Sequence, residues 1–168
     1  MKTILRSLLF AAVLVGSLSA CQSSRLDAAQ KSALFQARRQ QVQQAIANMD
    51  FKIEMNQMTP QRGNTRTITP DYYVMVKGDV VESYLPFIGE AYRSYLGENE
   101  STHEDRISSC EVARNDKKGY TMLVIRFRRT QDQYIYRLAI GDDGRATLMV
   151  TCSSRSNISY EGEIIDPL

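Results

Sequence analysis

The chain has 168 residues, of which 43% are hydrophobic, and its 21 basic and 19 acidic side chains give a formal net charge of +2. This length fits one ordinary domain, and so balanced a charge gives no electrostatic argument for binding nucleic acid. The chain holds one histidine and three cysteines, with no Cys-x-x-Cys pair. This set lacks zinc-ligand spacing, and we expect no metal or other cofactor.

Residues 1–20 have the order of a secretory signal peptide. Basic residues precede a short apolar run, Leu8–Val15, and small residues then lead to a cysteine. The run is too short for a comfortable transmembrane helix. The ending Leu18-Ser19-Ala20-Cys21 resembles the lipobox of bacterial lipoproteins, which implies lipid on the Cys21 sulfur and cleavage just before it. The alternative is an ordinary signal peptide cut near Ala20, with Cys21 left as a plain thiol.

A lipid on Cys21 predicts a protein that is anchored to the membrane and does not span it. Gln22 follows the cysteine, and no acidic run comes next. By resemblance to known sorting rules, this implies a cell-envelope protein on the outer membrane, facing the periplasm. Removing the signal peptide leaves 19 basic residues against 19 acidic ones. We read residues 21–25 as a polar tether and 26–168 as one domain.

The domain is expected to begin with a helix within residues 26–49, because this stretch has no Gly or Pro and is rich in good helix formers. Phe35, Val42, Ile46 and Met49 recur at spacings of seven, four and three, which places them on one helix face. We expect the C-terminal half to dock on the domain and the N-terminal half to lead to the membrane. The alternatives are a free stalk or a helix–helix seam between copies.

After Asp50 the hydrophobic period changes from 3.6 to 2, which indicates antiparallel strands. A turn-rich break is expected at 58–63, and an irregular stretch at 85–104. The strands before that stretch are expected at 51–56, at 66–69 as an edge strand stopped by Pro70, and at 72–76 and 80–84 as a hairpin. Five more strands follow between 106 and 164 with turn signals between them.

These elements define the expected fold class: mainly β (α+β), with an N-terminal helix followed by an antiparallel meander of about eight strands. Eight strands can curl into an open barrel or fold over as a two-layer sandwich. Cys110 and Cys152 both lie in the apolar register and should point inward. An oxidising periplasm permits a disulfide between them, which we weigh slightly above two separate buried thiols.

One long connection contains a run of aromatic residues with Pro86 and Gly89. Its candidate binding surface consists of Tyr84, Phe87, Tyr92 and Tyr95. Long connections often carry function, and aromatic rings make good recognition surfaces. The alternative, which we favour, is a plug that closes one end of the sheet. His103 follows in a polar stretch, where we expect a solvated loop residue.

Several segments resemble a known family. They are Met58–Gly63, Asp71–Val74, Val76–Asp79, Ser83–Tyr92, Asn115–Tyr120 and Ser156–Tyr160. Together they are similar to a family of Bacteroidetes lipoproteins of unknown function, the domain of unknown function 4251. The resemblance covers nearly the whole chain after Cys21. It implies a lipid-anchored envelope domain and no particular activity, and Cys110 and Cys152 are not part of the family pattern.

No catalytic residue set stands out from the sequence. We therefore expect a protein that is not an enzyme but a binding module for a partner protein or an apolar ligand. An alternative is a hydrolase of envelope glycans that uses paired carboxylates, and another is a structural spacer.

Overall fold

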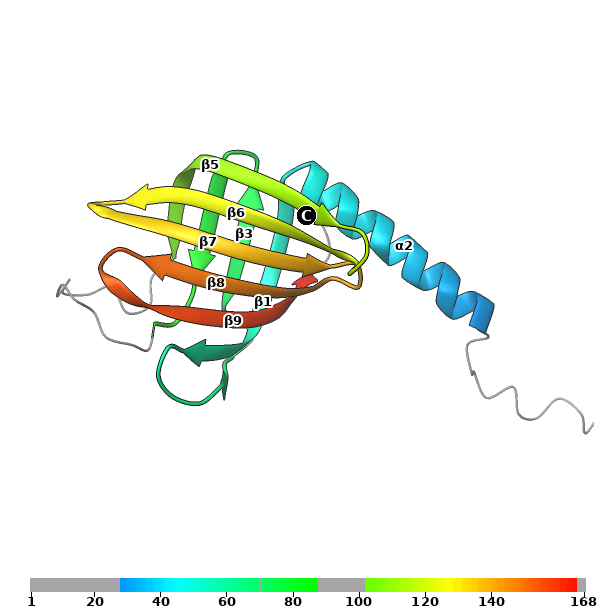
Figure 1. Cartoon of the computed structure of the whole chain (residues 1–168), viewed down its shortest axis with the longest axis horizontal. Helices are drawn as coiled ribbons and strands as arrows, with labels where there is room; N and C mark the ends of the chain where they lie inside the picture. Colours follow the sequence, from blue (N-terminus) through cyan, green and yellow to red (C-terminus); the bar gives the residue numbers. More distant parts are fainter. Residues whose placement is uncertain (1–27, 70, 88–101, 166–168) are drawn as a thin grey trace, which may run out of the picture. The chain divides into compact units, whose positions relative to one another are not determined.

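The computed structural model describes residues 28–69, 71–87 and 102–165 (Figure 1). The signal peptide, Cys21 and the tether lie outside the described residues, as do Tyr92 and Tyr95. The chain clusters into two compact units, residues 1–34 and 35–168. Of the first unit, only the beginning of the helix is described. The second unit holds the rest of the helix and all of the described strands.

The described part of the chain forms one helix and nine strands. Their bounds are α2 Ala28–Ala47, β1 Asp50–Pro60, β2 Arg66–Thr67, β3 Tyr73–Lys77, β4 Val80–Tyr84, β5 His103–Asn115, β6 Tyr120–Arg129, β7 Asp132–Gly141, β8 Arg145–Cys152 and β9 Arg155–Ile165.

The strands form an antiparallel barrel. Their order is β2-β1-β3-β4-β5-β6-β7-β8-β9, and an additional pairing between β1 and β9 joins the two ends of the eight longer strands. The two-residue β2 is an extra strand that pairs only with Gln57 and Met58 of β1. The predicted N-terminal helix and antiparallel meander are therefore confirmed. Of the two expected architectures, the barrel is the one that forms.

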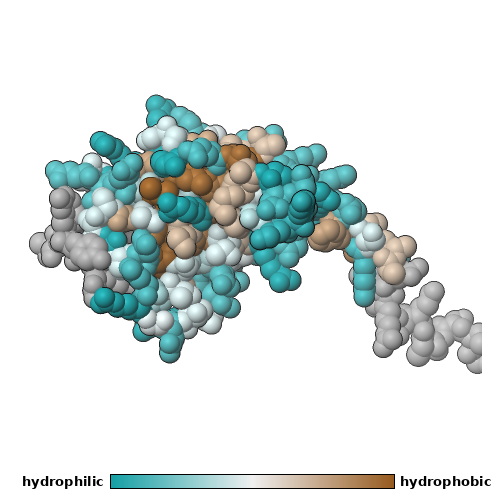
Figure 2. Space-filling view, viewed as in Figure 1, coloured by the Kyte–Doolittle hydropathy of each residue, from teal (hydrophilic) through white to brown (hydrophobic). Residues whose placement is uncertain are grey.

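The inward side chains lie in rows across neighbouring strands, because directly opposed residues point to the same face. One row contains Leu123, Leu138 and Leu148, all at most 1% exposed. A second row contains Phe127, Tyr134 and Cys152. These rows fill the barrel with apolar and aromatic side chains. Over β5–β7 the outer surface mixes hydrophobic and hydrophilic patches (Figure 2).

The last turns of α2 pack on the barrel through a short apolar stripe. Val42, Ala45 and Ile46 are buried and belong to the hydrophobic core. Arg38 also donates a hydrogen bond to the carbonyl of Ile164, at 2.5 Å. Docking of the C-terminal half is therefore confirmed. Phe35, expected on the same face, is 46% exposed, so the stripe that packs is shorter than the sequence pattern.

Two strands extend beyond their predicted ends. β1 continues to Pro60, through part of the expected turn-rich break, because β9 pairs with it as far as Ile158. β5 begins at His103, inside the stretch expected to be irregular, because β4 pairs with residues 103–106. In both cases a partner strand distant in sequence supplies hydrogen bonds that the local sequence does not announce.

No helix in the described ranges is both long and apolar enough to cross a membrane.

Candidate functional site

A cavity of about 50 Å³ lies at one end of the barrel. Its lining comes from the end of β4, the start of β5, the end of β6, the start of β7, the end of β8 and the start of β9. Antiparallel strands bring these termini to the same end. The contacts of α2 involve the opposite ends of the strands, at Asp142 and Ile164. The cavity therefore lies at the barrel end that α2 does not close.

Three tyrosines and a serine form its deepest wall. Tyr134, Tyr136 and Tyr160 are at most 6% exposed, and Ser83 is 4% exposed. The Tyr136 hydroxyl donates to Ser83 Oγ at 3.1 Å, and the Tyr160 hydroxyl donates to the carbonyl of Pro86 at 2.7 Å. Burial raises the pKa of all three tyrosines above the ordinary value, so these hydroxyls stay protonated and act as hydrogen-bond donors.

Arg129 brings a guanidinium group to the cavity from the end of β6. Its Nε donates to Asp105 Oδ2 at 2.9 Å, and its Nη2 contacts the same oxygen. Nη2 also reaches Ser83 Oγ at 3.4 Å, and the guanidinium lies 5.0 Å from the centre of the Tyr134 ring. Because the side chains of Arg129 and Asp105 are only 15% and 9% exposed, this ion pair is held in one geometry.

Two turns beside the cavity are tied together by Asp132. Its carboxylate accepts hydrogen bonds from Ser153 Oγ at 3.0 Å and from Ser154 Oγ at 2.6 Å. Thr130, in the β6–β7 turn, has a φ of +55°, a strained value for a β-branched residue. The Asp132 contacts stabilise the turn that holds this strain, and the same turn sets the position of Arg129.

The start of the long connection also lines the cavity. Leu85 and Phe87 are half-buried against the core, and the Arg155 guanidinium lies 5.0 Å from the centre of the Phe87 ring. Tyr84 is half-buried and packs on Tyr72, with ring centres 5.0 Å apart. Of the four aromatic residues singled out in the sequence, Phe87 is thus placed in the cavity wall and Tyr84 beside it in β4.

Phe87→Ala tests whether this residue is packing or exposed surface. Full burial of a phenylalanine makes truncation cost about 3–5 kcal/mol. Because Phe87 is only half-buried, we expect the free energy of unfolding to fall by about 1–2 kcal/mol. Thermal or urea unfolding measures this change. A loss below about 0.5 kcal/mol would instead assign Phe87 to a surface that contributes nothing to the core.

Sequence reasoning missed three other cavity residues. His103 was expected to be a solvated loop residue, but it opens β5, is half-buried and lines the cavity. Ser83 and Arg129 were not singled out. A signal for Arg129 exists in the sequence, since it continues the inward alternation of Ile125 and Phe127. An arginine in an inward register needs a partner, but the sequence does not show that the partner is Asp105.

Cys110 and Cys152 are free thiols, so the expected disulfide is not formed in the structure. Cys110 lies on β5 and Cys152 on β8, with two strands between them. Three strand spacings amount to roughly 14 Å along the barrel wall, whereas a disulfide needs Cα atoms within about 7 Å. Both side chains do pack against the core, as the register predicts, and Cys152 also lines the cavity.

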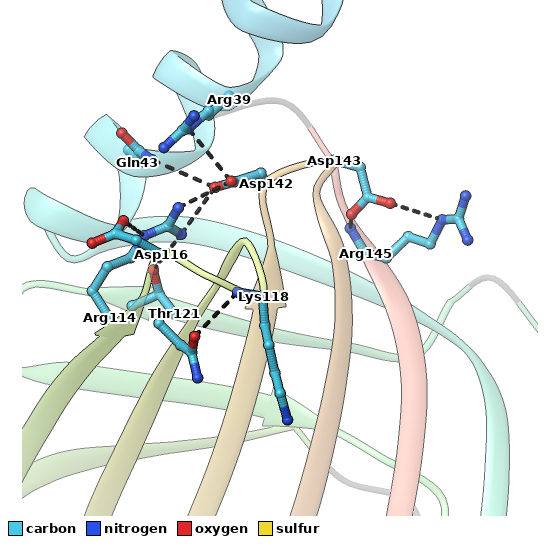
Figure 3. Close-up of polar contacts among 10 residues, drawn as sticks. Arg39, Gln43, Arg114, Asp116, Lys118, Thr121, Asp142, Asp143 and Arg145 are labelled. Carbon is cyan, nitrogen blue, oxygen red and sulfur yellow. Dashed lines mark hydrogen bonds and ion pairs between the residues drawn. The ribbon is translucent and has the colours of Figure 1, made fainter.

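A second polar cluster lies at the α2 end (Figure 3). Arg114 donates to both carboxylate oxygens of Asp142 at 2.9 Å, while Arg39 and Gln43 of α2 reach the same carboxylate at 3.4 Å. The hydrogen bond from Arg114 holds the pKa of Asp142 below its ordinary value of 3.8. We assign this cluster a structural role, because its contacts to Asp142 tie both α2 and β5 to the β7–β8 turn.

The two ends therefore differ in chemistry. The α2 end is closed by a satisfied ion-pair cluster, whereas the other end has a cavity with aromatic, apolar and guanidinium groups. Among the described residues, no group of three His, Cys, Asp or Glu side chains is arranged to hold a metal ion. Fold and site together define a small antiparallel barrel with a cavity at one end.

Comparison with known proteins identifies the family. The model of the family described as a domain of unknown function, DUF4251, matches residues 34–164, and the chain belongs to this family. A similar fold occurs in the crystal structure of a DUF4251 family protein from Bacteroides eggerthii DSM 20697. The TM-score is 0.61 at 17% identity, over 77% of this chain and 88% of that one. The comparison with curated proteins gave no match.

Proposed function

We propose that this protein is a lipid-anchored binding module of the cell envelope, and that the barrel-end cavity is its site for an apolar ligand. The observation that carries the proposal is the cavity itself, at the mouth of the barrel, where β-barrels commonly bind ligands. Its wall includes Leu85 and Phe87, from the start of the longest connection between strands. Connections of this length in compact domains are often functional.

The size of the cavity limits what enters it. A cavity of about 150 Å³ binds benzene, so one of about 50 Å³ admits only a narrower group. The end of an unbranched acyl or alkyl chain is narrow enough to enter such a cavity, and the rest of the chain would extend outward. The alternative of a glycan hydrolase has no observation in its favour here, because no Asp or Glu is among the described residues that line the cavity.

A blocked cavity tests the proposal. Val150 lines the cavity, whereas Thr147 lies on the same strand with an exposed side chain. We expect 1-octanol to bind the natural protein in isothermal titration calorimetry, and Val150→Phe to abolish that binding. Thr147→Phe is the matched control and should bind octanol like the natural protein. Equal binding by all three proteins, or no binding by any of them, would refute a site in this cavity.

The anchor is tested separately, with Cys21→Ser. A serine hydroxyl cannot replace the cysteine sulfur as the lipid attachment point, so this variant should lose lipidation and leave the membrane fraction. The readout is fractionation of cells together with the mass of the N-terminal peptide. If the native N-terminal peptide carries no lipid, the anchor is wrong, while a cavity that still binds octanol would keep the rest of the proposal intact.

A further inference from the structure

The side chains that line the cavity are rich in hydrogen-bond donors. Its described lining contains two arginines, one histidine and three tyrosines but no carboxylate side chain. Arg129 forms an ion pair with Asp105, and the guanidinium groups of Arg129 and Arg155 both belong to the lining. These donors favour a ligand group that accepts hydrogen bonds, and guanidinium groups bind carboxylates more strongly than neutral acceptors.

Ser83 is the clearest unused donor. It is 4% exposed, and its Oγ accepts one hydrogen bond from Tyr136 and another from Arg129. Because Ser83 Oγ is the acceptor in both hydrogen bonds, its own hydroxyl proton is still available, and no described residue accepts it. A buried donor without an acceptor costs free energy, which an acceptor on a ligand in the cavity would recover.

Arg129 provides a second donor beside it. Its Nε and Nη2 contact Asp105, and its Nη2 also contacts Ser83, but no hydrogen bond within the described chain uses Nη1. The ion pair with Asp105 fixes the plane of the guanidinium, so the direction of the two Nη1 protons is also fixed. Nη1 is bonded to the same carbon atom as Nη2, and Nη2 lies 3.4 Å from Ser83 Oγ. The two unused donors therefore belong to neighbouring groups, and one carboxylate has two oxygens to accept from them.

We propose that the group held in the cavity is the carboxylate of an apolar monocarboxylic acid. Its oxygens accept from Ser83 Oγ and Arg129 Nη1, and its first carbons contact Leu85, Phe87 and Val150. This inference rests on the proposed function and names the class of ligand for the same cavity. Two sources share this chemistry, a free fatty acid and the C-terminus of an apolar peptide.

The test compares ligands that differ only at the end group, on the full processed chain. We expect octanoate to bind at least about tenfold more tightly than 1-octanol in titration calorimetry, since hydrogen bonds to charged groups contribute on this scale. Ser83→Ala should weaken octanoate binding more than octanol binding, so that most of this preference is lost, and urea unfolding shows separately that the variant is folded. Ser159→Ala, on the outward register of β9, is the matched control.

A second pair of probes separates the two sources. A short leucine peptide with a free C-terminal carboxylate is compared with the same peptide as its C-terminal amide. If the ratio of these two affinities exceeds the ratio of octanoate to octanol affinity, the ligand is assigned to peptide ends. The reverse order assigns it to fatty acids. If octanol binds as tightly as octanoate, and the peptide amide as tightly as the acid, the carboxylate inference is overturned while the cavity remains a binding site. If none of the four probes binds, the proposed function fails as well.

Discussion

Gly162→Ala should prevent the barrel from closing. Gly162 lies on β9 opposite Met55 of β1, at the pairing that joins the two ends of the sheet. A Cβ at this position would lie 2.0 Å from the carbonyl oxygen of Glu54 and 3.0 Å from the Cα of Met55. Both are backbone atoms, so no side-chain rotation relieves the clash. We expect the free energy of unfolding to fall by at least about 3 kcal/mol.

The measurement is urea unfolding, with hydrogen exchange of the β1 and β9 amides to locate the damage. Glu161→Ala, at the preceding exposed position, is the control and should change the stability by less than about 0.5 kcal/mol. The register supports a local cause, because a bulge between Met55 and Gln57 lies directly opposite Gly162. A Gly162→Ala protein with natural stability would show that the β1–β9 pairing tolerates a side chain there.

Asp142→Ala should loosen α2 from the barrel. Asp142 and Arg114 are 10% and 25% exposed, and their paired contacts are joined by Arg39 of α2. Removing the carboxylate leaves Arg114 inward-facing without its main partner. Breaking a fully buried ion pair costs about 3–5 kcal/mol, and the partial exposure of Arg114 reduces this to about 2–3 kcal/mol. The rates of amide hydrogen exchange at Val42 and Ile46 should therefore be higher in Asp142→Ala than in the natural protein.

The stabilisation that the Asp142 carboxylate provides should also disappear in acid. The pKa of Asp142 is lower in the folded protein than its ordinary value of 3.8, chiefly because of the hydrogen bond from Arg114. The stabilisation of the folded protein by the Asp142 carboxylate is therefore present above about pH 4 and is lost as the pH falls through the pKa of the folded state. Thermal melts from pH 7 to pH 2 should show the natural protein converging on Asp142→Ala. Asp116→Ala, whose side chain is 80% exposed, is the control and should remain close to the natural protein throughout.

The proposed ligand site differs in its hydrogen bonding from the opposite end of the same barrel. Inward arginines occupy both ends, Arg114 beside α2 and Arg129 beside the cavity. At the α2 end the guanidinium of Arg114 bonds to Asp142, Asp116 and Thr121. At the cavity end, Nη1 of Arg129 has no hydrogen-bond partner among the described residues, and the hydroxyl proton of neighbouring Ser83 has no acceptor among them. This difference is the reason that we place function at one end and stability at the other.

Local sequence patterns determined the elements. The period-2 alternation places side chains such as Leu123 and Ile125 on one face whatever the strand pairs with, so the strands and their inward residues could be predicted. Lys77-Gly78-Asp79 likewise predicted the β3–β4 hairpin, where Gly78 has a φ of +60°. The helix and the inward register of both cysteines follow from patterns within a few residues.

Only the tertiary structure decided how the sheet closes and which residues meet. β1 and β9 are about a hundred residues apart, and their pairing depends on the bulge at Met55 and on the missing side chain of Gly162. The strand order likewise keeps Cys110 three strand spacings from Cys152 and brings Ser83 to Arg129. Alternation fixes the face of a side chain but not its neighbours across the barrel, which depend on the stagger between strands distant in sequence. For that reason the cavity could not be found from the sequence.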